Sequence, residues 1–337
     1  MNETNKVFLT FDYELFFGQS GTIDKCLLLS TEELLAILAK YNMLATFFVD
    51  ATFLAFLKNQ GLNSHLAKIE NNIHLILGGG HRIELHIHPQ WIDAVADDGK
   101  DTFTFKDYRY YSLNDCPKEV EENLFDDAFQ TLDGICKRFD SRYEIKGYRA
   151  GGWCIDKFEK VKPLFEQYGL LFDSSVLPGL QKVGVIQSYD YSDILLDKSI
   201  YCFDNDVHET LLQGRFFEVP ITIYKAGINV KYARIISRRF HTEKLIPFGD
   251  GKSIDQNNGD FKKNWKFYFD KLFSSQYEMC SIDGYCNTSN LVKIACKREF
   301  TTIVGHPKSL TLKSMETLEE LGKQNLCFTT IYDYLTK

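Results

Sequence analysis

Several signatures of common protein classes are missing from this 337-residue sequence. No run approaches the ~18 to 20 apolar residues that a membrane-spanning helix needs. The polar residues 1–6 lead into a strand-like run and not into the apolar core of a signal peptide. We therefore expect no transmembrane segment, no export signal and a location in the cytoplasm.

The chain also lacks a strong excess of basic charge. It has 39 Lys and Arg against 46 Asp and Glu, a net charge of -7, so nothing favours nucleic acid as a partner. Its nine cysteines form no C-x-x-C pair, which favours reduced thiols and disfavours metal binding through sulfur. No G-x-S-x-G and no phosphate-binding loop occurs, which argues against a serine hydrolase and a nucleotide-binding site.

Aromatic residues, in contrast, are plentiful, at 14% with Phe 27 and Tyr 18. Many of the phenylalanines fall in short apolar runs and are expected in a core, such as Phe8, Phe47 and Phe172. A smaller set is expected to face a ligand such as a sugar: Tyr13, Trp91, Tyr108, Tyr110, Tyr111 and Trp153.

Strand-like and helix-like segments alternate along the chain. Strands are predicted at 6–11, 44–49, 82–87, 145–148, 170–172, 216–219 and 301–304, with helices at 66–77, 117–135, 156–168 and 312–321. Ser30 to Glu33 has the pattern of a capping box and predicts that another helix begins there. This alternation indicates a parallel sheet, arranged as a barrel or as a doubly wound sheet.

Two long stretches interrupt the alternation, at 94–116 and 224–298. The second carries basic residues (Lys231, Arg234, Arg238, Arg239 and Lys244, and lysines in 262–268). A solvated face and a dock for an anionic ligand or a membrane both remain open for them. We expect one domain, residues 1–337, with 224–298 as an insertion or subdomain.

Polar residues able to do chemistry follow five of the predicted strands. Their positions are Asp12 and Glu14, His86 and His88, Arg149, Asp173, and His306. In parallel α/β proteins the carboxyl ends of the strands carry the active site, so we expect these groups to meet at one edge.

His86 and His88 lie on the same side of an extended segment, because strand side chains alternate. They could ligate one metal ion, or be one packed and one surface histidine. Asp12 and Glu14 have the same spacing and could complete a two-histidine, one-carboxylate site.

The segment 149–153 is the second candidate constellation. Arg149 can pair with a carboxylate and hold a base in place. Gly151 and Gly152 permit close backbone approach, although a plain glycine turn fits equally. Trp153 could lie in the core or against a sugar ring, and His306 could protonate a leaving group.

These motifs resemble the polysaccharide deacetylase family, the NodB-homology carbohydrate esterases. Residues 9–12 (L-T-F-D) are similar to the family's T-F-D-D-G, 45–49 to its A-T-F-F-V strand, and 80–86 to its G-H-E-I-G-x-H. Residues 149–153 resemble its arginine motif, 172–175 its Y-D-S strand, and 304–307 its final histidine motif.

The resemblance implies a distorted (β/α) barrel of about seven parallel strands. It also implies metal-dependent hydrolysis of an N-acyl group, usually acetyl, on an amino sugar or glycan precursor. Asp12 would be the general base, Arg149 would orient Asp12, and His306 would be the acid. Substrate contacts would come from Tyr13, Trp91, Gly151, Gly152, Trp153 and Asp173.

The sequence departs from the family at two metal-binding positions. Tyr13 stands where the family has its second aspartate, and Gln90 where it has its second histidine. We therefore expect Glu14 and His88 to act as ligands with His86, for a divalent ion, most simply zinc. Two alternatives remain: hydrolysis of another C–N bond, in a formamido sugar or a small cyclic amide, and a catalytically silent carbohydrate-binding barrel. A homo-oligomer is left open.

Overall fold

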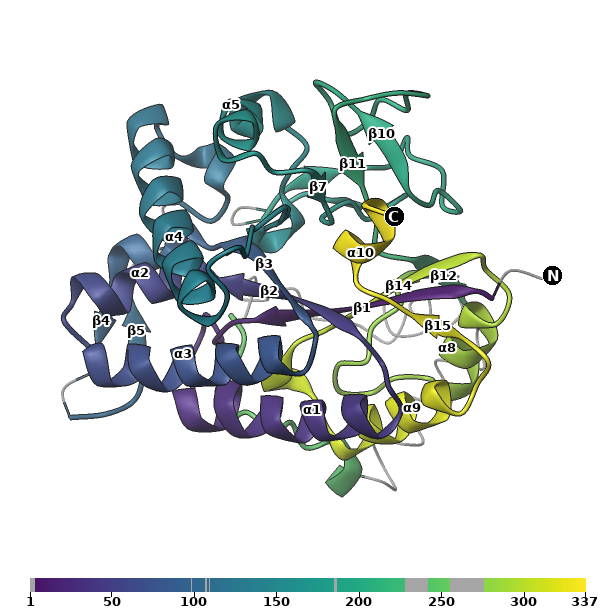
Figure 1. Ribbon diagram of the computed structural model, residues 1–337, viewed down its shortest axis with the longest axis horizontal. Helices are drawn as coiled ribbons and strands as arrows, with labels where there is room; N and C mark the ends of the chain where they lie inside the picture. The colour runs from purple at the N-terminus through teal and green to yellow at the C-terminus, as the bar shows by residue number, and fades with distance from the viewer. Residues whose placement is uncertain are drawn as a thin grey trace, which may run out of the picture.

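The computed structural model describes residues 4–97, 99–106, 108, 110–184, 187–227, 242–254 and 276–337. Strands and helices alternate, and a curled sheet forms the centre of the molecule (Figure 1). The strands of this sheet are β1 (Lys6–Tyr13), β2 (Ala45–Asp50), β3 (Arg82–Ile87), β6 (Gly147–Ala150), β7 (Phe172–Asp173), β10 (Tyr201–Phe203), β11 (Phe216–Glu218), β14 (Phe300–Gly305) and β15 (Cys327–Phe328).

The sheet is almost entirely parallel. Its order is β10-β11-β7-β6-β3-β2-β1-β14, and β15 pairs with β1 beside β2. Only β10 is antiparallel to its neighbour. The carboxyl ends of the parallel strands therefore meet at one edge, as the sequence predicts.

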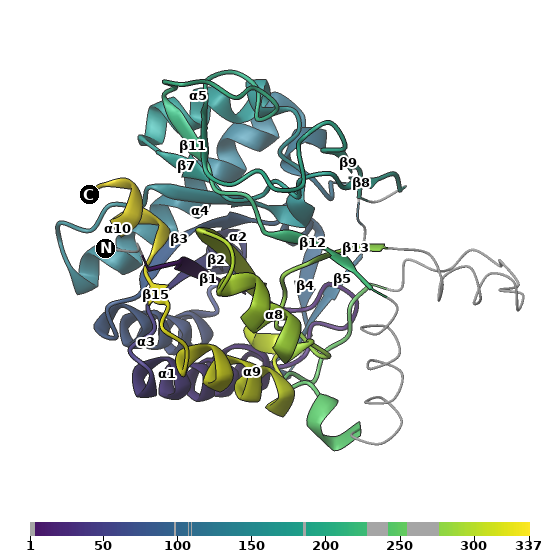
Figure 2. The same cartoon turned by 90° about the vertical axis from the view of Figure 1, so that its right-hand side faces the viewer.

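Helices cover the outer face of the sheet. They are α1 (Ser30–Lys40), α2 (Ala51–Asn59), α3 (Asn63–Gly78), α4 (Lys118–Phe139), α5 (Phe158–Tyr168), α8 (Thr288–Ala295) and α9 (Leu312–Gly322), while the short helix α10 (Ile331–Leu335) packs on the inner face. Figure 2 shows α1, α3 and α9 side by side below the sheet, with α5 on the far side of it. The predicted helices at 66–77, 117–135, 156–168 and 312–321 are confirmed to within a few residues.

The two faces of the sheet bury different side chains. The larger apolar cluster lies between the sheet and its helices and includes Leu9, Phe47 and Leu85. A smaller cluster fills the inner face: Phe8, Phe48, Phe172, Val219 and Ile331. The predicted core role of Phe8, Phe47 and Phe172 is confirmed, because all three are fully buried.

The curled sheet comes close to a closed barrel. The chain after β11 reaches β14, where the Thr222 amide donates to the Thr302 carbonyl at 3.1 Å and the Thr302 amide donates to the Thr222 hydroxyl at 2.9 Å. Side-chain packing from α10 fills the inner face. The predicted distorted barrel with a parallel sheet is therefore confirmed.

The helix expected to begin at Ser30 begins earlier. A π-helical segment, Asp24–Leu29, runs directly into α1, and the Ser30 hydroxyl donates to the Cys26 carbonyl at 2.8 Å. The predicted capping box is therefore wrong. Ser30 satisfies its hydroxyl inside the helix, a pattern that sequence alone does not distinguish from an N-cap.

The two interruptions contain structure of their own. The described part of 94–116 includes a hairpin of β4 (Ala94–Ala96) and β5 (Phe103–Phe105), and in the second stretch β12 (Ile223–Ala226) pairs with β13 (Gln276–Met279). The basic residues Lys231, Arg234, Arg238 and Arg239 and those in 262–268 lie outside the described residues. The single-domain interpretation stays a prediction.

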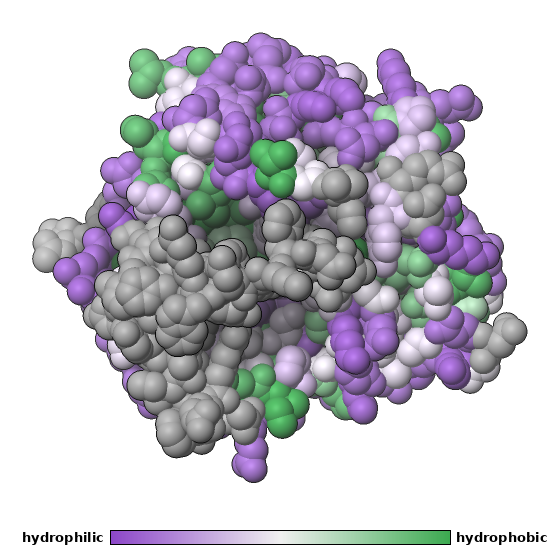
Figure 3. Space-filling model, turned by 180° about the vertical axis from the view of Figure 1, so that it is seen from behind, coloured by the Kyte–Doolittle hydropathy of each residue, from purple (hydrophilic) through white to green (hydrophobic). Residues whose placement is uncertain are grey.

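Within the described part of the chain, no helix is long and apolar enough to cross a membrane. All nine cysteines are free thiols. On the face that Figure 3 shows, the described residues are mainly hydrophilic and the hydrophobic groups are small and scattered.

Candidate active site

The alternation of side chains along β1 decides which residues reach the barrel interior. Asp12 and Glu14 point inward from the end of the strand, where both line one cavity. Tyr13, between them, faces the helix layer and belongs to the larger apolar cluster. The same alternation brings His86 and His88, at the end of β3, into the cavity.

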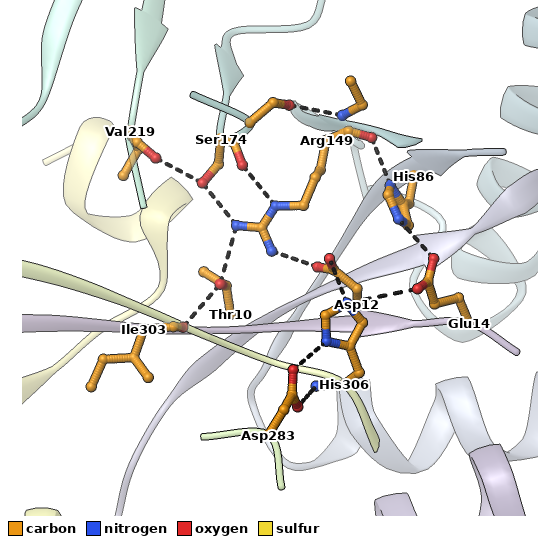
Figure 4. A network of polar contacts seen from close by, with 12 residues as sticks. Thr10, Asp12, Glu14, His86, Arg149, Ser174, Val219, Asp283, Ile303 and His306 are labelled. Carbon is orange, nitrogen blue, oxygen red and sulfur yellow. Dashed lines mark hydrogen bonds and ion pairs between the residues drawn. The ribbon is translucent and has the colours of Figure 1, made fainter. Parts of the chain in front are cut away.

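Asp12 forms a buried ion pair with Arg149 from β6. The Arg149 Nη1 donates to the Asp12 Oδ1 at 2.5 Å, and the two side chains are 0% and 2% exposed (Figure 4). The pairing was predicted from sequence as a means of orienting the base, and the structure brings the two residues together.

The Arg149 guanidinium is fixed by further contacts. Its Nε donates to the Ser174 carbonyl at 2.7 Å, and its Nη2 donates to the hydroxyls of Ser174 and Thr10 at 2.9 and 3.1 Å. The Phe48 ring lies 4.0 Å from the guanidinium carbon. The acceptors on β1 and on the residue that follows β7 fix the position of the guanidinium.

This environment keeps Asp12 ionised. Burial raises the pKa of the Asp12 carboxyl, but Arg149 and His306 outweigh burial, and the pKa lies below its usual range. The Asp12 Oδ2 is 3.4 Å from the His306 Nε2. A carboxylate that can accept a proton is therefore present at neutral pH.

His306 follows β14 and is held by Asp283. The His306 Nδ1 donates to the Asp283 Oδ2 at 2.6 Å, and the His306 backbone amide donates to the Asp283 Oδ1 at 2.7 Å (Figure 4). Burial lowers the pKa of the imidazole, but Asp283 and Asp12 raise it to about 10. His306 is therefore protonated at neutral pH and can donate a proton.

Glu14, His86 and His88 bring three potential ligand atoms within 4.8 Å of one another. The Glu14 Oε2 lies 3.1 Å from the His86 Nε2 and 2.5 Å from the His88 Nε2, and the two Nε2 atoms are 2.9 Å apart. All three side chains are buried. Two imidazoles and one carboxylate form the donor set of many zinc sites that keep an open position.

The hydrogen bonds around these residues fit a metal ion. The His86 Nδ1 lies 2.7 Å from the Arg149 carbonyl, so it carries the proton and leaves a lone pair on Nε2. The His88 Nδ1 has no hydrogen-bond partner although the residue is 3% exposed. The donor set therefore fits a divalent ion, with His86 held more firmly than His88.

Lys308, two residues after His306, completes the surroundings of Glu14. Its Nζ donates to the Glu14 Oε1 and to the Leu15 carbonyl, both at 2.7 Å. Burial raises the pKa of Glu14, but Lys308 and His88 outweigh it and lower the pKa well below its usual value. Lys308 thus occupies one carboxylate oxygen and leaves Oε2 for the two histidines.

These groups share one cavity of about 330 Å³. Gly152 and Trp153, predicted to contact substrate, line it together with Tyr111. Gly152 and Trp153 both have positive φ angles, 63° and 66°, a conformation that costs energy for a tryptophan and is often found at functional sites.

Three of the predicted substrate contacts lie elsewhere. Trp91 is 2% exposed and its indole donates to the Asp50 Oδ2 at 2.7 Å within an aromatic cluster. Tyr13 is 1% exposed on the helix side of β1. Asp173 is fully buried and accepts from the Ser175 amide and hydroxyl. None of them lines the cavity.

Gly151 is also buried beside the cavity and not in its wall. A Cβ there would meet the Ile87 carbonyl at 2.4 Å and the His88 Nδ1 at 2.9 Å. Gly151 is therefore required for the close approach of β6 to His88, which is a structural contribution to the site.

Sequence reasoning missed Asp283, Lys308 and Gln187, all of which line the cavity. Lys308 lies in a short 3-10 helix, Pro307–Ser309, so the strand alternation that relates His86 to His88 does not apply to it. Asp283 lies in a turn after β13 and Gln187 between two short strands, β8 (Gln181–Lys182) and β9 (Tyr189–Asp190). No motif marks either position.

No family model and no curated protein matches the sequence significantly. Several solved structures are similar in fold. A Mycobacterium smegmatis protein assigned as a polysaccharide deacetylase is 12% identical, with a TM-score of 0.49, covering 100% of this chain and 91% of that one. A family 4 carbohydrate esterase from Streptomyces lividans, in complex with acetate, is 10% identical, with a TM-score of 0.41 and coverage of 97% and 93%.

The PuuE allantoinase is similar as well, at 12% identity and a TM-score of 0.44, covering 98% of this chain and 89% of that one. These structures are similar to this chain over nearly its whole length, at 10% to 12% identity.

Proposed function

We propose that the protein is a metal-dependent hydrolase that removes an N-acyl group, in the first place acetyl, from an amino sugar or glycan precursor. One observation carries this proposal. The ionised Asp12 held by Arg149, the protonated His306 and the trio Glu14, His86 and His88 all line the same cavity. A site that only bound carbohydrate would have no need for a buried base and a buried acid facing each other.

The metal site would be formed by the trio, with zinc as our candidate ion. A divalent ion there would supply an acidified water and would polarise the acyl carbonyl. Glu14 and the two histidines would hold it through Oε2 and the two Nε2 atoms, while Lys308 neutralises the other oxygen of Glu14.

Asp12 would take the proton from the attacking water. It is well placed because its Oδ2 faces the cavity while its Oδ1 is occupied by Arg149. Arg149 does not touch substrate in this proposal. It orients the carboxylate and keeps it ionised inside a buried site.

His306 would donate a proton to the nitrogen that leaves as an amine. Asp283 fixes the ring through Nδ1, so the Nε2 proton points toward Asp12 and the cavity. An amide nitrogen is a poor leaving group without protonation, and a positioned acid of this kind contributes typically ~10² to 10⁴ in rate.

The aromatic and polar walls support a sugar as substrate. Trp153 offers an apolar ring surface, and Gln187 and Ser309 offer hydrogen-bonding groups along the same cavity. A reducing compartment such as the cytoplasm forms part of the proposal, because all nine cysteines are free.

The test is acid release by zinc-loaded protein from N-acetylated and N-formylated amino sugars and from a small cyclic amide, since the acid released identifies the bond. Asp12→Asn should lower kcat by ~10² to 10⁴ while the protein still binds zinc. Asp193→Asn, at an aspartate whose side chain is 67% exposed, is the matched control and should keep full activity. A protein that binds no metal and releases no acid would refute the proposal.

A further inference from the structure

We propose that the cavity accepts a single N-acylated amino sugar, free or at the end of a chain, and excludes the interior units of a polysaccharide. This inference rests on the hydrolase function proposed above and concerns the substrate class of the same site. Its basis is a segment, residues 249–254, that lies against the loops after β1 and β14 and supplies part of the cavity wall. We call this segment the strap.

The strap is bound to the loop after β1. The amides of Gly18 and Gln19 donate to the Lys252 carbonyl at 3.0 and 2.9 Å, and the Lys252 amide donates back to the Gln19 carbonyl at 2.8 Å. The Asp250 carboxylate accepts from the Thr22 amide at 2.8 Å. The strap is thus paired with this loop much as one strand pairs with another.

The strap is bound equally to the loop after β14. The Gly249 amide donates to the Lys308 carbonyl at 3.1 Å, and the amide of Phe248, the residue before the strap, donates to the Leu310 carbonyl at 2.8 Å. Lys308 also contacts Glu14. The strap is therefore bound directly to the loop that carries both His306 and Lys308.

Glycines let the strap lie directly on its neighbours. A Cβ on Gly251 would meet the Phe16 ring at 2.4 Å and the Gln19 carbonyl at 2.5 Å, and one on Gly249 would meet the Lys308 carbonyl at 2.6 Å. On the facing loop, a Cβ on Gly18 would meet the Ser253 carbonyl at 2.5 Å. No space for a sugar remains between the strap and the loops, so the strap acts as a fixed wall.

Ser253 and Ile254 of the strap line the cavity. Another part of the wall comes from Gln187, whose Nε2 donates to the Gly152 carbonyl at 2.5 Å and whose Oε1 accepts from Lys182. The lining also includes groups from the loops after β1 and β14 and from the turn at Asp283. A polysaccharide passing through would need an exit on two sides, and these segments stand around the cavity.

The size of the cavity agrees with a single amino sugar as its occupant. Its volume of about 330 Å³ lies at the lower end of the ~300 to 1,000 Å³ range of small-molecule sites. A volume of this size fits one sugar ring with its acyl group beside Asp12 and His306.

The experiment compares N-acetyl monosaccharides (glucosamine, galactosamine and mannosamine forms) with the β-1,4-linked tetramer of N-acetylglucosamine. Zinc-loaded protein is used, and mass spectrometry locates the units that have lost acetyl. We expect acid from a monosaccharide and loss of acetyl from one terminal unit only. Loss from interior units at a comparable rate would overturn the inference and leave the hydrolase function standing, whereas no acid from any substrate would overturn both.

A substitution in the strap tests the cause. Ile254→Ala opens the wall without touching the glycines, and we expect the ratio of kcat/KM for tetramer over monosaccharide to rise about tenfold. Ile246→Ala, at an isoleucine that is 62% exposed, is the matched control and should leave the ratio unchanged. An unchanged ratio in folded Ile254→Ala protein would refute the strap as the determinant.

Discussion

At the scale of single residues, Lys308 shows how a buried carboxylate can be limited to one ligand atom. Its ammonium occupies the Glu14 Oε1, so only Oε2 faces His86 and His88. Replacing the lysine would free the carboxylate to rotate and would remove the charge that keeps it ionised.

We therefore predict that Lys308→Met weakens zinc binding by ~10 to 100-fold, the usual effect of removing a residue that orients a ligand. Isothermal titration with Zn²⁺ measures this without reference to activity. Lys323→Met, at a lysine whose side chain is 47% exposed, controls for loss of a lysine. Equal zinc affinity in Lys308→Met and wild type would contradict the prediction.

Tyr13 gives the opposite case, a residue that sequence reasoning placed at the substrate and the structure places in the core. Its hydroxyl is buried without a hydrogen-bond partner. Because an unsatisfied buried hydroxyl costs ~1 to 3 kcal/mol, we predict that Tyr13→Phe raises the free energy of unfolding by about 1 kcal/mol and leaves activity intact.

Urea unfolding measures the effect, with Tyr143→Phe as the matched control. The Tyr143 hydroxyl donates to the Ile83 carbonyl at 2.9 Å and accepts from the Ile83 amide at 2.7 Å, so its removal should destabilise the protein. A stable Tyr13→Phe protein with lost activity would return Tyr13 to the site.

Residue spacing predicted which side chains of one strand lie on the same side, but not which residues from distant segments they contact. The two-residue spacing correctly indicated that Asp12 and Glu14, and His86 and His88, share a side of their strands. The same alternation turns Tyr13 toward the helix layer, a consequence that the sequence prediction did not draw when it placed Tyr13 at the substrate. Asp283 could not be predicted, because only the folded chain brings its turn beside His306.

At the scale of elements, the adjacent strands β7 and β11 carry an unusual pair of acids. Asp173 and Glu218 are register partners, and both are fully buried. Burial and, for Glu218, the neighbouring Asp173 raise the pKa of both carboxyls above their usual values. In the folded protein the two carboxyls therefore hold a proton to a higher pH than they do in the unfolded chain, where each has its ordinary pKa.

This arrangement predicts a pH-dependent stability. A carboxyl whose folded pKa is raised stabilises the protein fully below the unfolded value of 4.5 and loses that contribution as pH rises toward the folded value. Glu218→Gln keeps the shape and removes the titration. We expect its stability relative to wild type to increase between pH 5 and pH 8.

Urea unfolding of both proteins at the two pH values gives the difference directly. Glu209→Gln, at a half-buried glutamate whose Oε2 accepts from the Asn205 amide at 3.4 Å, should track wild type across the range. A stability difference between Glu218→Gln and wild type that does not change with pH would show that the pair does not hold the proton.

Element boundaries were the harder part of the prediction. Strand 82–87 and helix 66–77 could be predicted because apolar periodicity and the glycines 78–80 mark them. The start of the first helix could not, because Ser30 resembles a cap in sequence and lies within a continuous helix in the structure. The helix propensity of Ser30 does not determine where this helix begins, because the packing of the Asp24–Leu29 segment extends it in the N-terminal direction.

At the scale of the whole molecule, alternation of strands and helices was enough to predict a parallel sheet, but it left a barrel and a doubly wound sheet open, because both bury their strands on both faces. The barrel was expected from the family resemblance. The strap was not predictable. It belongs to the long interruption at 224–298 and is held mainly by backbone hydrogen bonds and glycine contacts, which leave no periodic pattern in the sequence.

The metal site makes a final prediction about the whole fold. Glu14, His86 and His88 come from β1 and β3 and the loops that follow them, so an ion bound between them links two parts of the barrel. A ligand that binds only the folded state at 100 times its Kd adds about 2.7 kcal/mol of stability. Zinc should therefore raise the Tm of metal-free protein by a few degrees, and a chelator should reverse the change.

His86→Ala should abolish the shift, and His208→Ala, at a histidine that pairs with Asp193 away from the cavity, should retain it. A Tm that is the same with zinc and with chelator in the wild type would show that the three residues do not form a metal site.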